Sequence, residues 1–292
     1  MKVSDDDAHI PPLVSAAWLL ENFHRQDLAI VDASWRMPGA GFAHADHLAR
    51  HIPGAVFFDI DAAAAPDTDL PHMAPSPDAF AAYVSNLGLS NDHTVVVYDD
   101  IGVFSAPRVW WTFRLMGHAP VVVLNGGLPA WRDAGGVLED GPSKIRQSAL
   151  FHASFSPHHL ADAEMVQRAL TNKNAVVLDA RPAPRFSGRT AEPRSGLRCG
   201  HMPGARNLPY TELIDKRGQM KSAKSLAETF DTVGVSPDQE IISSCGSGVT
   251  AAILALGLHL IGCEHVRVYD GSWAEWGRLS NDTGAFPVAT ND

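Results

Sequence analysis

An internal repeat constrains the fold of this 292-residue chain more than any other feature. Three patterns occur in the same order in both halves: AIVDA at 29–33 and VVLDA at 176–180, HIPGA at 51–55 and HMPGA at 201–205, and VVVLNGG at 121–127 and VRVYDGS at 266–272. Self-similarity at an offset of about 145 to 150 residues indicates a duplicated domain. The chain is therefore expected to fold as two copies of one unit.

Each copy alternates short runs of β-branched residues with stretches of helical character. The clearest runs are at 95–98, 121–124, 176–178 and 240–243, and the clearest helical stretches are at 107–116 and 249–260. This alternation predicts an α/β fold of two tandem domains, each a mainly parallel sheet flanked by helices. Glycine and proline turn signals cluster between the copies, so we place the domains at 1–140 and 160–292 and a linker at 141–159.

Composition excludes several classes of protein. A hydrophobic content of 45% with 19% charged residues is typical of a globular chain, and a net charge of -10 offers no basic surface for nucleic acid. The acidic start at residues 5–7 does not fit a signal peptide, and the longest apolar run, at 249–263, is too short to cross a bilayer. We therefore expect a cytoplasmic protein with neither membrane nor nucleic-acid partners.

One cysteine stands where a reactive thiol is expected. Cys245 ends the apolar run IISS and begins the loop CGSGVT, after which a helix follows. Gly246 and Gly248 allow the backbone to turn so that successive N–H groups point inward, and the helix start adds its positive dipole end. The N–H groups from Gly246 through Val249 to Thr250 are the expected cradle for an anion on this sulfur.

The two copies differ at this position. An offset of about 145 residues, which aligns the glycines and the tryptophan near the end of each copy, places Asp100 opposite Cys245. In open α/β sheets the ligand site lies beyond the carboxyl ends of the strands, where Cys245 falls. The second copy is therefore predicted to be catalytic, and the first an inactive partner that closes the cleft.

With these motifs in both halves, the chain resembles the tandem rhodanese-type sulfurtransferases. The resemblance runs from about residue 13 to about residue 278, and its further markers are APRVWW at 106–111, LNGG at 124–127 and YDGSW at 269–273. It implies a persulfide on Cys245, taken from a small sulfur donor and passed to a thioredoxin-like thiol or to cyanide. No metal or organic cofactor is expected, because sulfur performs the chemistry itself.

The loop indicates which donor is used. Thiosulfate enzymes of this family typically carry basic residues after the cysteine, whereas this chain has Gly246 and Ser247. The chain thus resembles the branch that uses 3-mercaptopyruvate, whose carboxylate suits planar, bidentate arginines. The resemblance implies that Arg185 and Arg194 hold the carboxylate and keto oxygen of that donor.

The same resemblance implies a proton relay. In the family, the loop serine, here Ser247, is proposed to act with a histidine and an aspartate of the first domain, and His72 and Asp61 match them. A hydroxyl polarised by a neutral imidazole that a carboxylate orients can move a proton during sulfur transfer. The alternative is that His72 caps a turn and Asp61 pairs with a neighbour.

Three other functions compete with this interpretation. Thiosulfate:cyanide sulfur transfer differs only in the preferred donor. A cysteine phosphatase needs an arginine at the end of the loop, but Ala251 stands six residues after Cys245. A non-catalytic rhodanese-like binding module usually lacks the cysteine, which this chain retains.

Cys199 and Cys263 show neither disulfide nor CxxC spacing, and the fourteen histidines form no metal-binding pattern.

Overall fold

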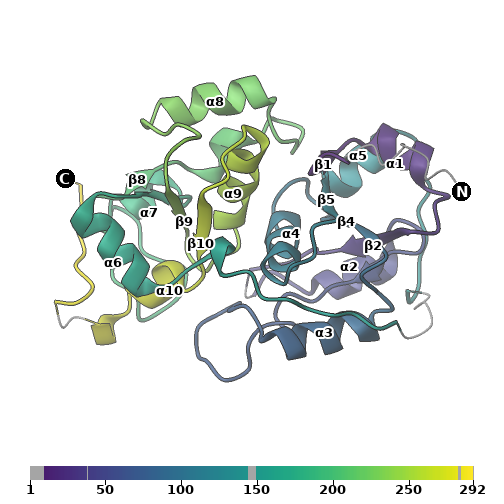
Figure 1. The fold of residues 1–292 in the computed structure, drawn as a ribbon, viewed down its shortest axis with the longest axis horizontal. Helices are drawn as coiled ribbons and strands as arrows, with labels where there is room; N and C mark the ends of the chain where they lie inside the picture. The colour runs from purple at the N-terminus through teal and green to yellow at the C-terminus, as the bar shows by residue number, and fades with distance from the viewer. Residues whose placement is uncertain (1–9, 38, 144–148, 282–283, 292) are drawn as a thin grey trace, which may run out of the picture.

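The computed structural model describes residues 10–37, 39–143, 149–281 and 284–291. Two α/β domains lie side by side, the N-terminal one on the right of Figure 1 and the C-terminal one on the left. Each is built around a sheet of five parallel strands. Both sheets have the same strand order, β1-β5-β4-β2-β3 and β6-β10-β9-β7-β8, which confirms the predicted duplication and fold class.

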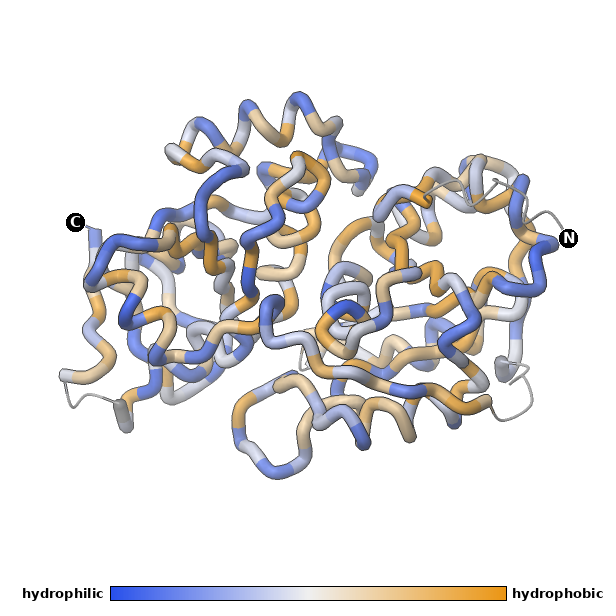
Figure 2. The backbone as a smooth tube through the Cα atoms, in the orientation of Figure 1, coloured by the Kyte–Doolittle hydropathy of each residue, from blue (hydrophilic) through white to orange (hydrophobic). Residues whose placement is uncertain are grey.

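The strands are short, and the central ones are mostly buried. Those of the N-terminal sheet are β1 (Leu13–Val14), β2 (Leu28–Asp32), β3 (Val56–Phe57), β4 (Thr94–Tyr98) and β5 (Val121–Leu124). Those of the C-terminal sheet are β6 (Leu160–Ala161), β7 (Val176–Asp179), β8 (Arg206–Asn207), β9 (Ile241–Ser244) and β10 (Val266–Tyr269). Nearly continuous apolar runs are expected for parallel strands covered on both faces, and Figure 2 shows them as orange segments inside each domain.

Helices occupy matching places in the two domains. The N-terminal domain has α1 (Ala16–Asn22), α2 (Ala43–Ala49), α3 (Pro77–Asn86), α4 (Ala106–Leu115) and α5 (Gly127–Asp133). The C-terminal domain has α6 (Ala163–Asn172), α7 (Ala183–Phe186), α8 (Ala223–Asp231), α9 (Ala251–Leu260) and α10 (Ser272–Trp276), with short 3₁₀ turns at Pro157–His159, Tyr210–Leu213 and Leu279–Asn281. None of the helices in the described ranges is long and apolar enough to span a bilayer.

Side-chain caps set the starts of four of these helices. Ser15 caps α1 and Asp162 caps α6, each accepting a hydrogen bond from the backbone three residues on, at 3.1 and 2.8 Å. Ser76 and Ser222 do the same for α3 and α8, both at 3.3 Å. Such caps satisfy N–H groups that the first helical turn leaves unpaired. The duplication has therefore preserved the local signals that begin equivalent helices.

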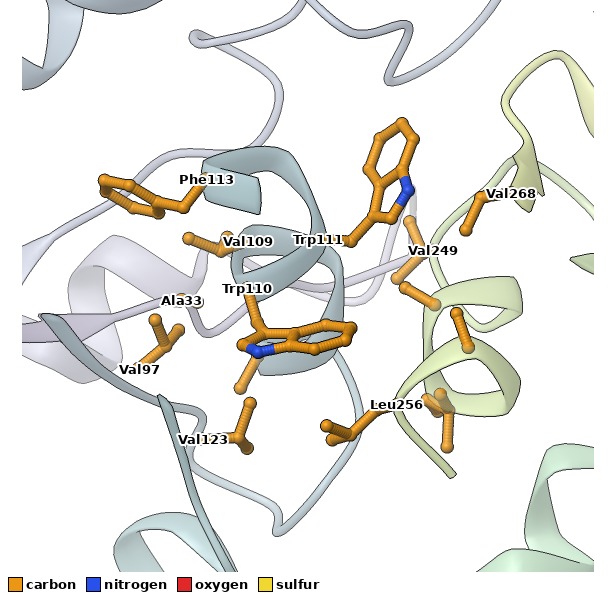
Figure 3. Close-up of a cluster of buried hydrophobic side chains, with 14 of the residues drawn as sticks. Ala33, Val97, Val109, Trp110, Trp111, Phe113, Val123, Val249, Leu256 and Val268 are labelled. Carbon is orange, nitrogen blue, oxygen red and sulfur yellow. The ribbon is translucent and has the colours of Figure 1, made fainter. Parts of the chain in front are cut away.

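The largest hydrophobic cluster belongs to both domains. Helix α4 of the N-terminal domain faces α9 of the C-terminal domain across the middle of the molecule (Figure 1). Trp110 and Trp111 of α4 are each 2% exposed and belong to the same buried cluster as Val249 and Leu256 (Figure 3). This largest cluster crosses the domain boundary and fixes the position of one domain against the other, while smaller clusters lie within each domain.

Part of the predicted linker packs against the N-terminal domain. Phe151 is 2% exposed and meets Phe80 and Phe113 edge-to-face, and the N–H groups of Ser154 and Ser156 donate to the end of α4. The described residues 149–156 therefore extend the first core before β6 begins the second sheet. The boundaries at 140 and 159 stay a prediction.

Asp99, rather than Asp100, is the counterpart of Cys245. The backbone N–H of Leu128 donates to the carbonyl of Asp99 at 2.9 Å, as the N–H of Trp273 donates to that of Cys245 at 3.0 Å. The loop at 99–105 is one residue longer than the loop at 245–250, so an offset that aligns the following helices misses by one at the strand end. The predicted pairing of Asp100 with Cys245 was wrong for this reason.

Candidate active site

Cys245 follows β9 at the carboxyl edge of the C-terminal sheet and is only 2% exposed. Its N–H donates to the hydroxyl of Ser272 at 3.1 Å, and that hydroxyl donates to the carbonyl of Tyr269 at 2.7 Å. Its carbonyl accepts from the N–H of Trp273. The turn between β10 and α10 therefore fixes the backbone on both sides of the thiol.

The loop after Cys245 offers unpaired N–H groups. Within the described residues, the N–H groups at 246–250 donate to no protein acceptor. Gly248 has φ of 80°, and a Cβ added there would lie 2.8 Å from Nη1 of Arg108 and 3.0 Å from the carbonyl oxygen of Asp270. Both the backbone conformation and the close packing therefore require glycine at this position. The result is a rigid loop with free donors beside a buried thiol.

The equivalent loop of the N-terminal domain shows what such donors can hold. The Asp99 carboxylate accepts hydrogen bonds from five backbone N–H groups, at 2.8 to 3.2 Å: those of Ile101, Gly102, Phe104, Ser105 and Ala106. Asp99 is fully buried, and burial raises the pKa of this carboxyl to about 6. The N-terminal loop thus encloses an anion that is part of the chain, whereas the C-terminal loop leaves its donors free for an added one.

Cys245 opens into a cavity of about 230 Å³ between the domains. Its lining comprises Trp35, Met37 and Phe104 of the N-terminal domain and Arg181, Pro182, Arg185, Arg194, Tyr210, Cys245, Gly246, Ser247, Val249 and Thr250 of the C-terminal domain. One wall is aromatic and aliphatic, and the other carries guanidinium groups. Such a cavity suits a small organic anion that brings one polar end to the arginines.

Arg185 is held by a buried carboxylate. Its Nε lies 3.2 Å from both oxygens of Glu192 and its Nη2 also pairs with Glu192, whose side chain is 1% exposed. Glu192 also binds Arg181 at 2.8 Å, and Arg181 in turn pairs with Asp179 at 2.6 Å. This chain of charges orients Arg185 while Nη1 keeps no protein acceptor in the described residues. The free side of the fork is available to a ligand.

Gly246 lies against the same arginine. A Cβ at Gly246 would stand 3.0 Å from Nη2 of Arg185. A basic side chain at this position, as expected in a thiosulfate enzyme, would therefore place a second cation beside Arg185. At this point of the loop the positive charge therefore comes from Arg185, which packs against the glycine, and not from a side chain of the loop itself.

Asp61 and His72 meet, as predicted, but the third contact differs. Nδ1 of His72 lies 2.6 Å from Asp61, and Nε2 lies 3.1 Å from Nη2 of Arg194. The bond to His72 holds the pKa of the Asp61 carboxyl below its usual range, and the indole N–H of Trp35 donates to the same carboxylate at 3.1 Å. Because Arg194 can only donate, Nε2 is the acceptor and Nδ1 carries the proton. His72 is therefore neutral in this arrangement.

Ser247 stands apart from this pair. It is 5% exposed and lines the cavity, but the described residues contain no hydrogen bond between its hydroxyl and His72. Burial lowers the pKa of the Arg194 guanidinium, while the nearby charge of Cys245 acts in the opposite direction. The structure thus brings Asp61, His72 and Arg194 into one chain of contacts. The relay through Ser247 stays a prediction.

Sequence reasoning missed the apolar wall and the charges behind the arginines. Trp35, Met37 and Phe104 come from loops of the domain without the thiol, and no local pattern marks them as cavity residues. Glu192 is visible in the sequence within the arginine-rich stretch, but its pairing with two arginines is visible only in three dimensions. The remaining cysteines are exposed (Cys199) or buried away from the cavity (Cys263), and no described group of three His, Cys, Asp or Glu residues is placed to bind a metal.

Comparison with known proteins shows the family. A model of the rhodanese-like domain matches twice, at residues 15–134 and 162–279. This chain belongs to the rhodanese-like family. It is 42% identical to 3-mercaptopyruvate sulfurtransferase of Escherichia coli, covering 90% of this chain and 94% of the relative, and 40% identical to the human enzyme of that name, covering 90% and 91%. A crystal structure of a 3-mercaptopyruvate sulfotransferase from Escherichia coli superimposes with a TM-score of 0.83 at 40% identity, over 91% of this chain and 100% of that chain.

Identity to these rhodanese relatives does not by itself select the donor. A mouse protein named thiosulfate sulfurtransferase is also 42% identical, over 91% of this chain and 92% of its own length. The choice between donors therefore depends on the residues around Cys245.

Proposed function

We propose that this rhodanese-like enzyme takes sulfur from 3-mercaptopyruvate, holds it as a persulfide on Cys245 and passes it to a thiol or to cyanide. The observation that carries the proposal is that Cys245, Arg185 and Arg194 line the same interdomain cavity, so one small ligand could contact all three. The relatives named for this reaction share about two fifths of the sequence over nine tenths of the chain.

The first half-reaction breaks one carbon–sulfur bond. The Cys245 thiolate attacks the donor sulfur, a sulfur–sulfur bond forms, and the electron pair of the carbon–sulfur bond leaves as the enolate of pyruvate, which then takes up a proton. We assign the donor carboxylate to the free side of Arg185 and the keto oxygen, where negative charge develops, to Arg194. Charge-assisted bonds to planar guanidinium groups suit both tasks.

The second half-reaction restores the thiolate. The persulfide is an anion, and the unpaired N–H groups at 246–250 would stabilise it as five N–H groups stabilise Asp99 in the other domain. An acceptor thiolate then attacks the outer sulfur, leaving the Cys245 thiolate and a persulfide on the acceptor. Two half-reactions that share one covalent intermediate predict ping-pong kinetics.

His72 would act chiefly through Arg194. His72, whose Nδ1 lies 2.6 Å from Asp61, presents Nε2 to Arg194 and fixes that guanidinium at the cavity. This arrangement favours an orienting role for Asp61 and His72 in the resting enzyme. A proton transfer through Ser247 would require the His72 ring to leave Arg194.

Thiosulfate is the alternative donor, and it fits this site less well. It lacks a carboxylate for Arg185, and the positions nearest the thiol, Gly246 and Ser247, carry no positive charge. Steady-state kcat/KM for both donors with one preparation tests the proposal, and we expect 3-mercaptopyruvate to be favoured at least about tenfold, equal to roughly 1.4 kcal/mol. Equal values for both donors would refute the donor assignment, and no turnover of either would refute sulfur transfer.

We also propose a thioredoxin-like thiol as the acceptor and the cytoplasm as the cellular location. A thioredoxin-like thiol is favoured by the aromatic and aliphatic side of the cavity, which suits a protein surface better than it suits cyanide. The cytoplasmic location stays a prediction.

A further inference from the structure

A buried ion pair joins the two domains directly behind the candidate active site. Arg108 on α4 and Asp270 after β10 are each 2% exposed, and Nη1 of Arg108 lies 2.6 Å from Oδ1 of Asp270. A buried charge is costly unless every polar group around it is satisfied, so such a pair needs several partners. The partners of this pair are parts of the site itself.

Arg108 binds both the cysteine loop and the histidine segment. Its Nη1 lies 3.4 Å from the carbonyl oxygen of Gly248 in the loop after Cys245, and its Nη2 donates to the carbonyl oxygen of His72. The guanidinium also lies over the ring of Trp111, 4.4 Å from its centroid. One side chain of the non-catalytic domain therefore contacts two backbone segments of the site.

Asp270 completes the same junction from the other domain. Its second oxygen, Oδ2, accepts from the N–H of Ala74 at 2.7 Å, two residues after His72. His72 has φ of 61°, a conformation that costs energy for a residue with a side chain and persists only where its surroundings hold it. Arg108 holds the backbone at the strained position 72 itself, and Asp270 holds it two residues later, at 74.

We infer that Arg108 and Asp270 form a positioning pair that couples the docking of the domains to the assembly of the site. Through Gly248 the pair sets the loop that carries the N–H groups, and through the 72–74 backbone it sets His72 and with it Arg194. Neither residue lines the donor cavity. The inference rests on the proposed sulfur transfer and adds two residues that act on it without touching the donor.

The test compares Arg108→Lys and Asp270→Asn with the wild type in the 3-mercaptopyruvate assay, with rates expressed per folded enzyme. Lysine keeps the charge but has one ammonium for acceptors that the guanidinium reaches with two nitrogens. We expect kcat to fall about 10- to 100-fold, as for a misplacement of the reacting groups by about 1 Å, while KM stays within about threefold because Glu192 holds Arg185 independently.

Asp69→Asn is the matched control. Asp69 and Arg278 also form an ion pair between the domains, at 2.9 and 3.0 Å, but Asp69 is exposed, and within the described residues no hydrogen bond or ion pair joins either residue to the loop after Cys245 or to His72. We expect the control to keep the wild-type kcat. Wild-type kcat in either Arg108→Lys or Asp270→Asn, or an equal loss of kcat in Asp69→Asn, would overturn the inference.

The two proposals fail in different ways. An inactive wild type would refute sulfur transfer from this donor, whereas an active wild type with unchanged variants would refute only the positioning role. If Arg108→Lys does not fold, Asp270→Asn decides, since it is nearly isosteric and keeps an acceptor for the guanidinium. A variant that melts at a lower temperature but keeps its kcat per folded molecule would show that the pair stabilises the fold alone.

Discussion

Replacing Arg185 by lysine tests how the donor is held. Arg185 binds Glu192 through Nε and Nη2, its Nη1 has no protein acceptor in the described residues, and the side chain lines the cavity. A lysine ammonium can pair with Glu192 or reach a donor carboxylate, but it cannot present two parallel N–H groups to the donor while Glu192 stays paired. The variant therefore loses at least one charge-assisted hydrogen bond to the donor.

The size of the effect follows from that count. One hydrogen bond to a charged group contributes about 1.5–3 kcal/mol, so kcat/KM for 3-mercaptopyruvate should fall roughly 10- to 150-fold. Thiosulfate has no carboxylate, so its kcat/KM should fall less. Stability should change little, because lysine keeps the positive charge beside Glu192.

Stopped-flow measurement separates formation of the persulfide from its discharge to a thiol. Only formation should slow in Arg185→Lys, since the acceptor brings no carboxylate to the same arginine. Arg189→Lys is the control on the same segment, because Arg189 is exposed and does not line the cavity, and it should leave both steps unchanged. Equal slowing of both steps in Arg185→Lys would show that the arginine shapes the loop rather than binding the donor.

Three further predictions follow. Cys245→Ser should abolish turnover, and intact-mass spectrometry after donor exposure should find about 32 Da added to the wild type and nothing added to the variant; an adduct on the variant would exclude Cys245 as the nucleophile. Gly246→Ala should raise KM for 3-mercaptopyruvate about two- to fivefold, because the added Cβ would lie only 3.0 Å from Nη2 of Arg185 and push the guanidinium aside. An unchanged KM would contradict that contact. Because burial raises the pKa of Asp99 to about 6, its contribution to stability is complete below about pH 4 and is lost as pH rises through 6. Chemical unfolding of wild type and Asp99→Asn at pH 4 and pH 7 should therefore show the difference in unfolding free energy moving against the wild type by about 2.4 kcal/mol, and a pH-independent difference would refute the raised pKa.

Most of the fold could be predicted from the internal repeat. Matching patterns in both halves predicted two parallel sheets, because strands buried on both faces leave apolar runs that sequence alone can reveal. The repeat could not reveal the interface between the two copies, where α4 packs against α9. Trp110 and Trp111 look like ordinary helix residues until α4 is placed against α9, so the shared core was visible only in the structure.

The candidate site likewise contains residues that the sequence indicated and residues that only the structure revealed. Cys245 and its glycines form a local pattern, and Arg185 and Arg194 were found through a family resemblance. Glu192 and Arg108 were missed because their role depends on partners distant in sequence or on the other domain. The error of one residue at Asp100 arose because a loop insertion changes the offset between copies, and a constant offset cannot show where an insertion lies.

The interface between α4 and α9 also limits how far the two domains can separate during turnover. Swinging the domains apart would bring Trp110 and Trp111 into water, and exposing about 300–500 Å² of aromatic surface costs about 8–12 kcal/mol. Fewer than about one molecule in 10⁵ would be open at any moment. We therefore expect donor and product to exchange through the mouth of the cavity, without full separation of the domains.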